Sequence, residues 1–430
     1  MNRKLWAIIA RGAAANSISQ AVNIIIQLAT LPILLTFWSV EQYGAWLILS
    51  AIPAYFAMAD FGMLTIASNK MTASHAQKDI KAANKIFQTA LKFCCYQIGV
   101  GATVAIALVA IYYYLNEPIA SALTLAFLIV STLLAMSGGV IDSVFRANNA
   151  YAMGTLLLNI PRAAEWLGLL VGAAITKSFV GAAAGQLIGR ASSSIFLAVY
   201  TARKYKNYTW STKEGSTTEI KNMLRPSLAY LAFPVGNSLS IQGMTIAVAT
   251  MFGPTAAAVF GAYRTASRIT VQLTTILNRA IWPELTRAWA TDNFPAVKKI
   301  TKGAIYATTA TAVACTVTLT LVGEKLIQRW SHGKIPYDHS IFTIMLIAAL
   351  ISCLWQPIQI SLVAANKHRD ISAIFLLACA IPPAWTTLAA NYSSTTSAAY
   401  SIVISEAAIL IGTFYLYSRA LDNSNREAQA

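Results

Sequence analysis

The sequence predicts an all-α polytopic membrane protein, and three observations carry this prediction. Of the 430 residues, 57% are hydrophobic and only 11% are charged, with a mean hydropathy of +0.56. A soluble domain has about 25% charged residues. Apolar runs of about 20 residues, the length that a helix needs to cross a bilayer, recur along the chain. Basic residues gather in alternate connections between these runs.

We expect about twelve transmembrane helices, most of them joined by short connections that make neighbouring helices antiparallel. The longest polar connection is basic and central, and it divides the chain into an N-terminal six-helix lobe (1–202), a cytoplasmic interlobe linker (203–226) and a C-terminal six-helix lobe with a short cytoplasmic tail (227–430). The predicted spans are 13–36, 44–68, 88–115, 119–147, 150–176, 179–202, 227–252, 255–282, 301–322, 339–364, 371–390 and 395–418.

The distribution of Lys and Arg predicts that both termini are cytoplasmic. One set of alternate connections, with the termini, holds 22 of the 32 basic residues, whereas the opposite connections hold 4. Basic residues concentrate in the cytoplasmic loops of membrane proteins. The net charge of +16 is therefore explained by topology, and we expect no nucleic-acid partner.

The first span carries four amide side chains on one helical face: Asn16, Gln20, Asn23 and Gln27. Their spacing of 4, 3 and 4 residues places them one above another. A polar stripe is poorly suited to lipid, so it faces either protein or water. One interpretation is hydrogen bonding between helices. The other is the wall of a hydrophilic cavity that binds substrate.

Several prolines interrupt the predicted helices, and each removes a backbone hydrogen bond. Transporters use broken helices as bending points. Pro234, in the PVGN sequence early in the seventh span, is the position at which we most expect a hinge.

Some charges lie close to the predicted cytoplasmic ends of spans. Asp142 and Arg146 are four residues apart and can pair with each other at a cytoplasmic rim, with a role in gating or ion coupling. Asp60 lies about two turns inside the second span. We expect Asp60 to serve fold and lobe gating, with ion coupling as the alternative.

Four arginines lie deeper in the spans: Arg162, Arg190, Arg264 and Arg268. Each ionised side chain in hydrocarbon costs roughly 2.5–3.5 kcal/mol, so such residues face a bundle interior or a water-filled path. The mid-span carboxylates Glu165 and Glu406 are fewer, which leaves a positive surplus. Glu165 is three residues from Arg162, so a local ion pair is available.

These deep charges come from both lobes, so they have two interpretations. One is internal ion pairing that fixes the helix bundle. The other is a two-walled central cavity that binds an anionic group, and arginine binds phosphate well because it offers two parallel donors. We expect all four arginines to contact substrate, and either glutamate to couple transport to an ion.

The sequence lacks the motifs of a cofactor-dependent or ATP-driven enzyme. It contains no GxxxxGK[ST] phosphate loop and no HExxH sequence. The five cysteines lie in apolar runs without metal-ligand spacing. We therefore expect a secondary transporter with no catalytic residues, no metal site and no cofactor.

Six stretches, in this order and spacing, resemble bacterial polysaccharide-export flippases. These Wzx-like O-antigen flippases form part of the polysaccharide transport family in the multidrug/oligosaccharidyl-lipid/polysaccharide (MOP) exporter superfamily. The similarity spans most of the chain. The stretches are YGAW at 43–46, DFGM at 60–63, FRANNAY at 145–151, GAYRTASRI at 261–269, PELTRAWA at 283–290 and ANKHRD at 365–370.

The resemblance implies a MOP/MATE-like fold, with two six-helix lobes around a central cavity, in the bacterial inner membrane. It implies that the protein moves an undecaprenyl-pyrophosphate-linked oligosaccharide, such as an O-antigen repeat unit, from the cytoplasmic to the periplasmic leaflet. Alternating access driven by a proton or sodium gradient is implied as well. A polysaccharide polymerase and a chain-length regulator are the implied protein partners.

The sequence leaves two other functions open. A multidrug or cation antiporter of the same superfamily would favour an acidic cavity, whereas the deep surplus here is basic. A membrane-embedded polysaccharide polymerase or ligase would need a large periplasmic loop with catalytic charges. The longest predicted periplasmic loop, 323–338, is only moderate.

Overall fold

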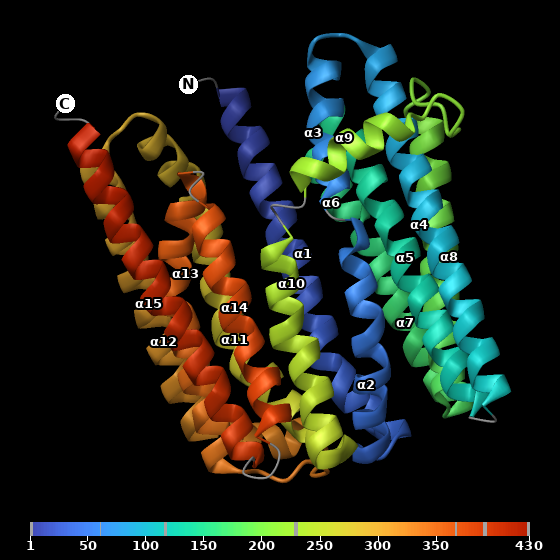
Figure 1. The fold of residues 1–430 in the computed structure, drawn as a ribbon, viewed down its shortest axis with the longest axis vertical. Coiled ribbons are helices and arrows are strands. Elements are labelled where there is room, and N and C mark those ends of the chain that lie inside the picture. Colours follow the sequence, from blue (N-terminus) through green and yellow to red (C-terminus); the bar gives the residue numbers. More distant parts are fainter. Residues whose placement is uncertain are drawn as a thin grey trace. The chain divides into compact units, whose positions relative to one another are not determined.

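The computed structural model describes residues 3–60, 62–115, 118–227, 231–365, 368–389 and 394–427, and every regular element in these ranges is a helix (Figure 1). Nine of the described helices are long and apolar enough to cross a membrane. The predicted all-helical, multi-pass membrane fold is thus confirmed. The count of twelve spans and the cytoplasmic position of the termini stay predictions.

The helices form two compact units. Unit 1 comprises residues 1–38 and 49–231, and unit 2 comprises residues 39–48 and 232–430. One helix, α2 (Val40–Phe56), contributes its first part to unit 2 and its second part to unit 1. The predicted lobe boundaries stay predictions, but residues 39–48 pack apart from the rest of the first 231 residues.

Unit 1 has its core between α3, α4 and α5, where Met71, Phe87 and Ile129 are fully buried. The helices α7 and α8 pack against each other, and α8 also packs on α5. Besides the second part of α2, the elements of unit 1 are α1 (Arg3–Phe37), η1 (Ala57–Asp60), α3 (Met63–Ala76), α4 (Ile80–Tyr114), α5 (Ile119–Ala147), α6 (Tyr151–Leu157), α7 (Asn159–Thr176), α8 (Phe179–Lys204) and α9 (Thr217–Ser227).

The predicted linker 203–226 is held against unit 1 over much of its length. The backbone N–H of Thr209 donates to Asn84 Oδ1 at 2.7 Å, and Lys92 Nζ donates to the carbonyl of Gly215 at 3.0 Å. The helix α9 then packs on α3 and α4. Side chains of α4 therefore replace water as partners for this polar segment.

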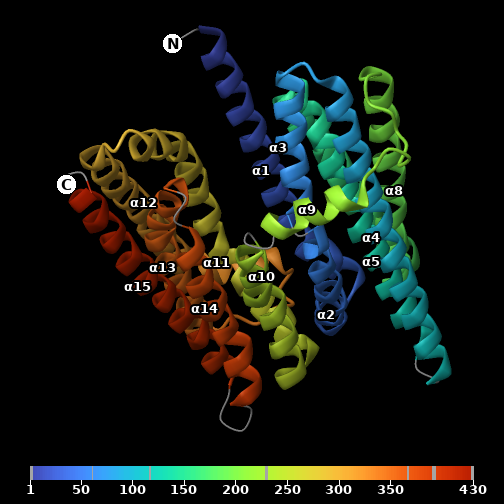
Figure 2. The same ribbon diagram turned by 45° about the horizontal axis from the view of Figure 1, so that its top comes forward.

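Unit 2 is centred on α13, which packs against α11, α12 and α15 (Figures 1 and 2). Asp338 caps α13 by accepting the backbone N–H groups of Ser340 and Ile341 at 2.8 and 3.1 Å. The elements of unit 2 are α10 (Ala232–Ser238), the π-helical turn η3 (Leu239–Gly243), α11 (Met244–Ala290), α12 (Phe294–Trp330), α13 (His339–Ala364), α14 (His368–Leu388) and α15 (Thr395–Glu427).

A sharp turn at Gly253 divides α11. Its φ of 87° and ψ of 168° are not helical, and glycine adopts such positive φ values at little cost. The sequence predicts a break between the spans 227–252 and 255–282, and the turn lies at that position.

The YGAW stretch packs tightly within unit 2. A Cβ added to Gly44 would lie 1.8 Å from the carbonyl oxygen of Pro254, so only glycine fits there. Tyr43 and Trp46 beside it are buried. This close backbone approach explains why residues 39–48 belong with unit 2 rather than unit 1.

Candidate functional site

Within unit 1, α7 and α8 pack so closely that their backbones touch. A Cβ added to Gly185 would lie 2.1 Å from the carbonyl oxygen of Gly168. Small residues at intervals of four let membrane helices approach in this way. The contact is made by Gly168 and Gly172 on α7 and by Gly181, Gly185 and Gly189 on α8.

This packing brings Glu165 of α7 and Arg190 of α8 into a mostly buried ion pair, with side chains 17% and 13% exposed. The same carboxylate accepts hydrogen bonds from Ser131 Oγ at 3.1 Å and Gln186 Nε2 at 2.8 Å. Glu165 therefore pairs across the two helices. The ion pair between Glu165 and Arg162, which their spacing of three residues allows, does not form.

Arg162 and Arg190 line one cavity of about 230 Å³ in unit 1. Arg162 Nη1 donates to Asn159 Oδ1 at 3.2 Å. Arg190 Nε is buried and has no hydrogen-bond partner in the described part of the chain. Two guanidinium groups line this cavity, and its described lining contains no carboxylate.

The cavity lies beside a break between α6 and α7. Pro161 is the third residue of α7 and also lines the cavity. Because proline has no N–H, the helix cannot continue its hydrogen-bond ladder through this position. Irregular backbone within a membrane is tolerated where it lines a cavity.

Asp142 and Arg146 form the ion pair that their spacing predicts, near the end of α5. The Arg146 guanidinium also lies over the ring of Tyr151, 4.5 Å from its centroid. Arg146 is exposed, as expected for a rim residue. The role of the pair in gating or ion coupling stays a prediction.

In unit 2, Arg264 of α11 binds the π-helical turn η3. Its Nη2 donates to the carbonyl of Ser240, and its Nη1 donates to the carbonyl of Ile241 at 3.3 Å. A π-helical turn displaces carbonyl groups from the regular ladder and often marks a functional site. The Arg264 guanidinium thus serves as a partner for this irregular backbone.

Arg268 lies one turn along α11 and shares a small cavity of about 30 Å³ with Arg264 and Glu406. Glu406 Oε2 accepts a hydrogen bond from Trp355 Nε1 at 2.7 Å. Among the described residues, no hydrogen bond and no ion pair within 4.0 Å holds the Arg268 guanidinium. A cavity of this size has room for a water molecule.

The structure therefore groups the deep charges into two sets, each with two arginines and one glutamate. Arg162 and Arg190 lie together in unit 1 beside Glu165. Arg264, Arg268 and Glu406 lie together in unit 2. That all four arginines share one central cavity stays a prediction.

Solved structures similar to this chain are transporters of one superfamily. A multidrug resistance MATE family transporter of the MOP superfamily, in an inward-facing conformation, has a TM-score of 0.78 at 12% identity, covering 94% of this chain and 96% of its own. A MOP superfamily transporter from Pyrococcus furiosus has a TM-score of 0.67 at 14% identity, covering 97% and 96%. A MATE structure in complex with MaL6 has a TM-score of 0.66 at 14% identity, covering 97% of both chains.

The protein has the MATE-like fold of the MOP superfamily. No protein-family model and no curated protein matches its sequence. At 12–14% identity the likeness concerns the fold of this MATE-like chain and does not identify its substrate.

The amide stripe of α1 lies partly against protein in this MATE-like chain. Asn16 accepts a hydrogen bond from the Tyr151 hydroxyl at 3.0 Å, which favours the helix–helix interpretation for that residue. Gln20 and Asn23 are half-buried, whereas Gln27 is exposed. Their role as a substrate-binding wall stays a prediction.

Two predicted gating positions lie at irregular places in the MATE-like fold. Asp60 ends the short 3₁₀ helix η1, and its side chain lies outside the described residues. Pro234 is an exposed residue near the start of α10, five residues before the π-helical turn that Arg264 binds. The hinge at Pro234 stays a prediction.

Sequence reasoning missed several partners of the charged residues. Asn159 lies three residues before Arg162, so helical spacing could have placed this amide beside the arginine, whereas Gln186 of α8 donates to Glu165 of α7, a contact between helices with no local signal. The glycines at four-residue intervals in α8 also carry a recognisable signal. The Trp355 contact to Glu406 joins separate helices and has no local signal.

Proposed function

We propose that this MATE-like protein is a flippase for an undecaprenyl-pyrophosphate-linked oligosaccharide, an O-antigen or related surface polysaccharide repeat unit. It moves this lipid from the cytoplasmic to the periplasmic leaflet of the bacterial inner membrane by ion-coupled alternating access. The observation that carries the proposal is the cavity lined by Arg162 and Arg190, whose described lining contains no carboxylate.

The chemistry of this cavity suits a phosphate group. Phosphate oxygens accept strong, charge-assisted hydrogen bonds from guanidinium groups. The buried Nε of Arg190 has no partner among the described residues, and a buried donor left unpaired costs about 1–3 kcal/mol. A bound phosphate oxygen would reach this buried Nε only if the Arg190 side chain turned towards the cavity. Glu165 and Asn159 hold the two arginines in position for this contact.

Ion coupling is assigned to Glu406 rather than Glu165. Glu165 already has three partners in Arg190, Ser131 and Gln186. Glu406 shares its cavity with Arg264 and Arg268, so a proton taken up by this carboxylate would remove the negative charge of the cavity and strengthen its attraction for an anion. A proton fits this role better than Na⁺, because Arg264 and Arg268 would repel a metal cation nearby.

Drug export is the second candidate, because one of the similar structures is a multidrug resistance transporter. Cationic drugs would be repelled by the arginine-lined cavity in unit 1. For the similar transporter from Pyrococcus furiosus, a reversed polarity of the binding pocket suggests a different function. By the same reasoning, the positive cavity here favours an anionic substrate.

Replacing Arg162 should weaken binding of the lipid pyrophosphate. We expect Arg162→Ala to reduce the affinity for undecaprenyl pyrophosphate in nanodiscs about tenfold or more, since a hydrogen bond to a charged group contributes about 1.5–3 kcal/mol. Arg162→Lys should recover part of this affinity, because lysine keeps the charge but not the paired donors.

The matched control is Arg287→Ala, since Arg287 is an exposed arginine outside this cavity. Undecaprenol, which lacks the pyrophosphate, should bind equally weakly to all variants. If the wild-type protein binds tetraphenylphosphonium but not undecaprenyl pyrophosphate, drug export is the better function.

Glu406→Gln should uncouple transport from the ion gradient. The amide keeps the size of the side chain and its acceptor for Trp355, but it cannot take up a proton. We expect flipping of the lipid pyrophosphate in proteoliposomes to lose its dependence on a pH gradient. Glu284→Gln, which changes an exposed carboxylate of unit 2 outside this cavity, is the matched control and should keep that dependence. Normal gradient dependence in Glu406→Gln would contradict the assignment.

A further inference from the structure

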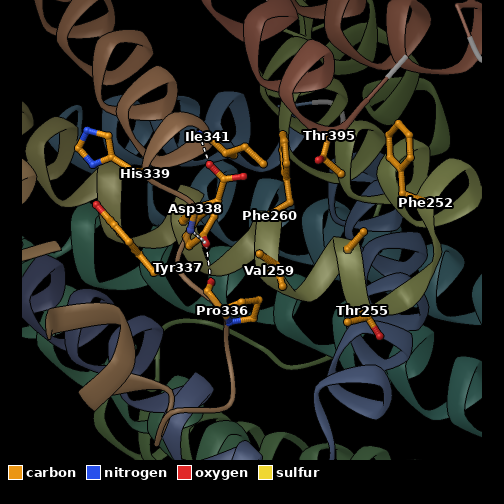
Figure 3. A pocket seen from close by; sticks show the side chains of 12 residues that line it. Phe252, Thr255, Val259, Phe260, Pro336, Tyr337, Asp338, His339, Ile341 and Thr395 are labelled. Atoms are coloured by element: carbon orange, nitrogen blue, oxygen red, sulfur yellow. Dashed lines mark hydrogen bonds between the residues drawn. The ribbon is translucent and has the colours of Figure 1, made fainter. Parts of the chain in front are cut away.

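A cavity of about 770 Å³, larger than the two described above, lies at one end of unit 2. Figure 3 shows the side chains that line it. It is formed by α11 on both sides of the turn at Gly253, by residues 336–339 and by the starts of α13 and α15. This is the end of the unit predicted to face the periplasm. Sites for small molecules have volumes of about 300–1,000 Å³, so the cavity has the size of a ligand site.

Aromatic rings form much of its lining, and several are held in place before any ligand binds. Tyr263 and Tyr337 lie 6.3 Å apart in an edge-to-face arrangement, and both pack on Phe342. The Tyr263 hydroxyl donates to the carbonyl of Pro336 and accepts the backbone N–H of Asp338. This double contact fixes residues 336–338 on α11, so the wall is preorganised and binding costs less conformational entropy.

Figure 3 shows Phe252 and Thr255 on one side of this cavity and Tyr337 on the other, with Phe260 and Asp338 between them. Among the described residues, the hydroxyl groups of Thr255, Tyr337 and Thr395 make no hydrogen bond. Burial, together with the negative charges of Glu324 and Asp338, raises the pKa of Tyr337, so its hydroxyl stays a donor at neutral pH.

The charge of this cavity is opposite to that of the arginine cavity in unit 1. Its described lining contains no Lys or Arg, and beside the carboxylate of Asp338 lies the imidazole of His339. Asp338 Oδ1 caps α13, which leaves Oδ2 to accept from a ligand. A phosphate would be repelled by this carboxylate. The cavity therefore suits an uncharged ligand that offers apolar faces to the rings and hydroxyl groups to the polar side chains.

We propose that this cavity is a binding subsite for neutral saccharide, with room for a mono- or disaccharide between Phe252, Phe260 and Tyr337. The inference rests on the proposed function, because the glycan of a lipid-linked oligosaccharide is the ligand that would reach it. The ring faces pack against the C–H faces of the sugar, while Thr255, Thr395 and Asp338 bind its hydroxyl groups. An organic cation also fits a carboxylate among aromatic rings, but it would leave the hydroxyl donors unpaired.

The test measures saccharide binding to the full-length protein in nanodiscs by saturation-transfer NMR. The probes are galactose, N-acetylglucosamine and rhamnose, which represent hexoses, N-acetylhexosamines and deoxyhexoses. We expect at least one to bind, and Phe252→Ala to weaken its binding about tenfold, the effect of losing one ring contact. The control Phe414→Ala, which removes a 61% exposed ring of α15, should bind as the wild type does.

Asp338→Asn distinguishes the two ligand classes, because asparagine also caps helices and keeps an acceptor. It should retain most saccharide binding. If none of the three sugars binds the wild type, or if Phe252→Ala and Phe414→Ala bind sugar equally, the subsite is refuted. Binding of tetraphenylphosphonium that Asp338→Asn abolishes, without sugar binding, would likewise refute it and identify a cation site.

Undecaprenyl pyrophosphate is titrated into the same samples, so that failure of the subsite and failure of the proposed function are separate results. Phe252→Ala should bind this sugar-free lipid as tightly as the wild type. If sugars bind at Phe252 while the lipid pyrophosphate does not bind at all, the subsite stands and the anion site in unit 1 is wrong.

Discussion

Arg190→Gln should abolish export of the lipid-linked glycan and also lower the thermal stability of the protein. The substitution leaves the Glu165 carboxylate mostly buried without its cationic partner. Breaking a buried ion pair by removing one member costs about 3–5 kcal/mol. Loss of export by this variant alone would therefore not distinguish binding of the substrate from folding.

The double variant Glu165→Gln/Arg190→Gln separates these effects. Two neutral amides can bond to each other, to Ser131 and to Gln186, so we expect the melting temperature in detergent to return towards that of the wild type. Export should stay lost, because the cavity has lost one of its two guanidinium groups. Both properties are measured on the same variants, export as surface glycan in a flippase-deficient strain.

The pair Glu284 and Arg287 provides the matched control, because these side chains are 53% and 51% exposed. Such surface pairs contribute about 0–1 kcal/mol, so Glu284→Gln/Arg287→Gln should leave both properties unchanged. Normal export by the stable double variant Glu165→Gln/Arg190→Gln would show that Arg190 only holds the helices together.

The fold was accessible from the sequence because the bilayer restricts what a chain can do. The length of the apolar runs and the distribution of basic residues can be read along the whole chain and indicate the spans and their orientation. In lipid, a run of this length satisfies its backbone hydrogen bonds by forming a helix. The break at Gly253 was also accessible, since it separates two apolar runs. That residues 39–48 belong to unit 2 could not be predicted, because this depends on a backbone contact between Gly44 and Pro254, two residues that are far apart in the sequence.

The candidate site was accessible only in part, for a related reason. Depth in a span identified Arg162, Arg190, Glu165 and Glu406 as costly residues that need partners. Which arginine pairs with Glu165 depends on packing between helices. Glu165 therefore pairs with Arg190 of the neighbouring helix rather than with Arg162, which is nearer in the sequence. The π-helical turn bound by Arg264 was likewise not predictable, since its residues read as ordinary helix.

Gly185→Ala should destabilise unit 1 and weaken the anion site, although alanine favours helix over glycine by about 1 kcal/mol. The new Cβ would lie 2.1 Å from the Gly168 carbonyl oxygen, which belongs to the backbone and cannot rotate away. Overpacking of this kind costs about 1–3 kcal/mol. The helices α7 and α8 must therefore separate, which lengthens the contact between Glu165 and Arg190 and displaces both arginines of the cavity.

The matched control is Gly99→Ala in α4, where the added Cβ would meet no atom within 4 Å. This variant should be as stable as the wild type or slightly more stable, because only the gain in helix propensity applies. We expect the melting temperature and the affinity for undecaprenyl pyrophosphate to fall in Gly185→Ala and to stay at the wild-type values in Gly99→Ala. Equal behaviour of the two variants would mean that the close contact of α7 and α8 does not position the arginines, and that their cavity tolerates a wider separation of the helices.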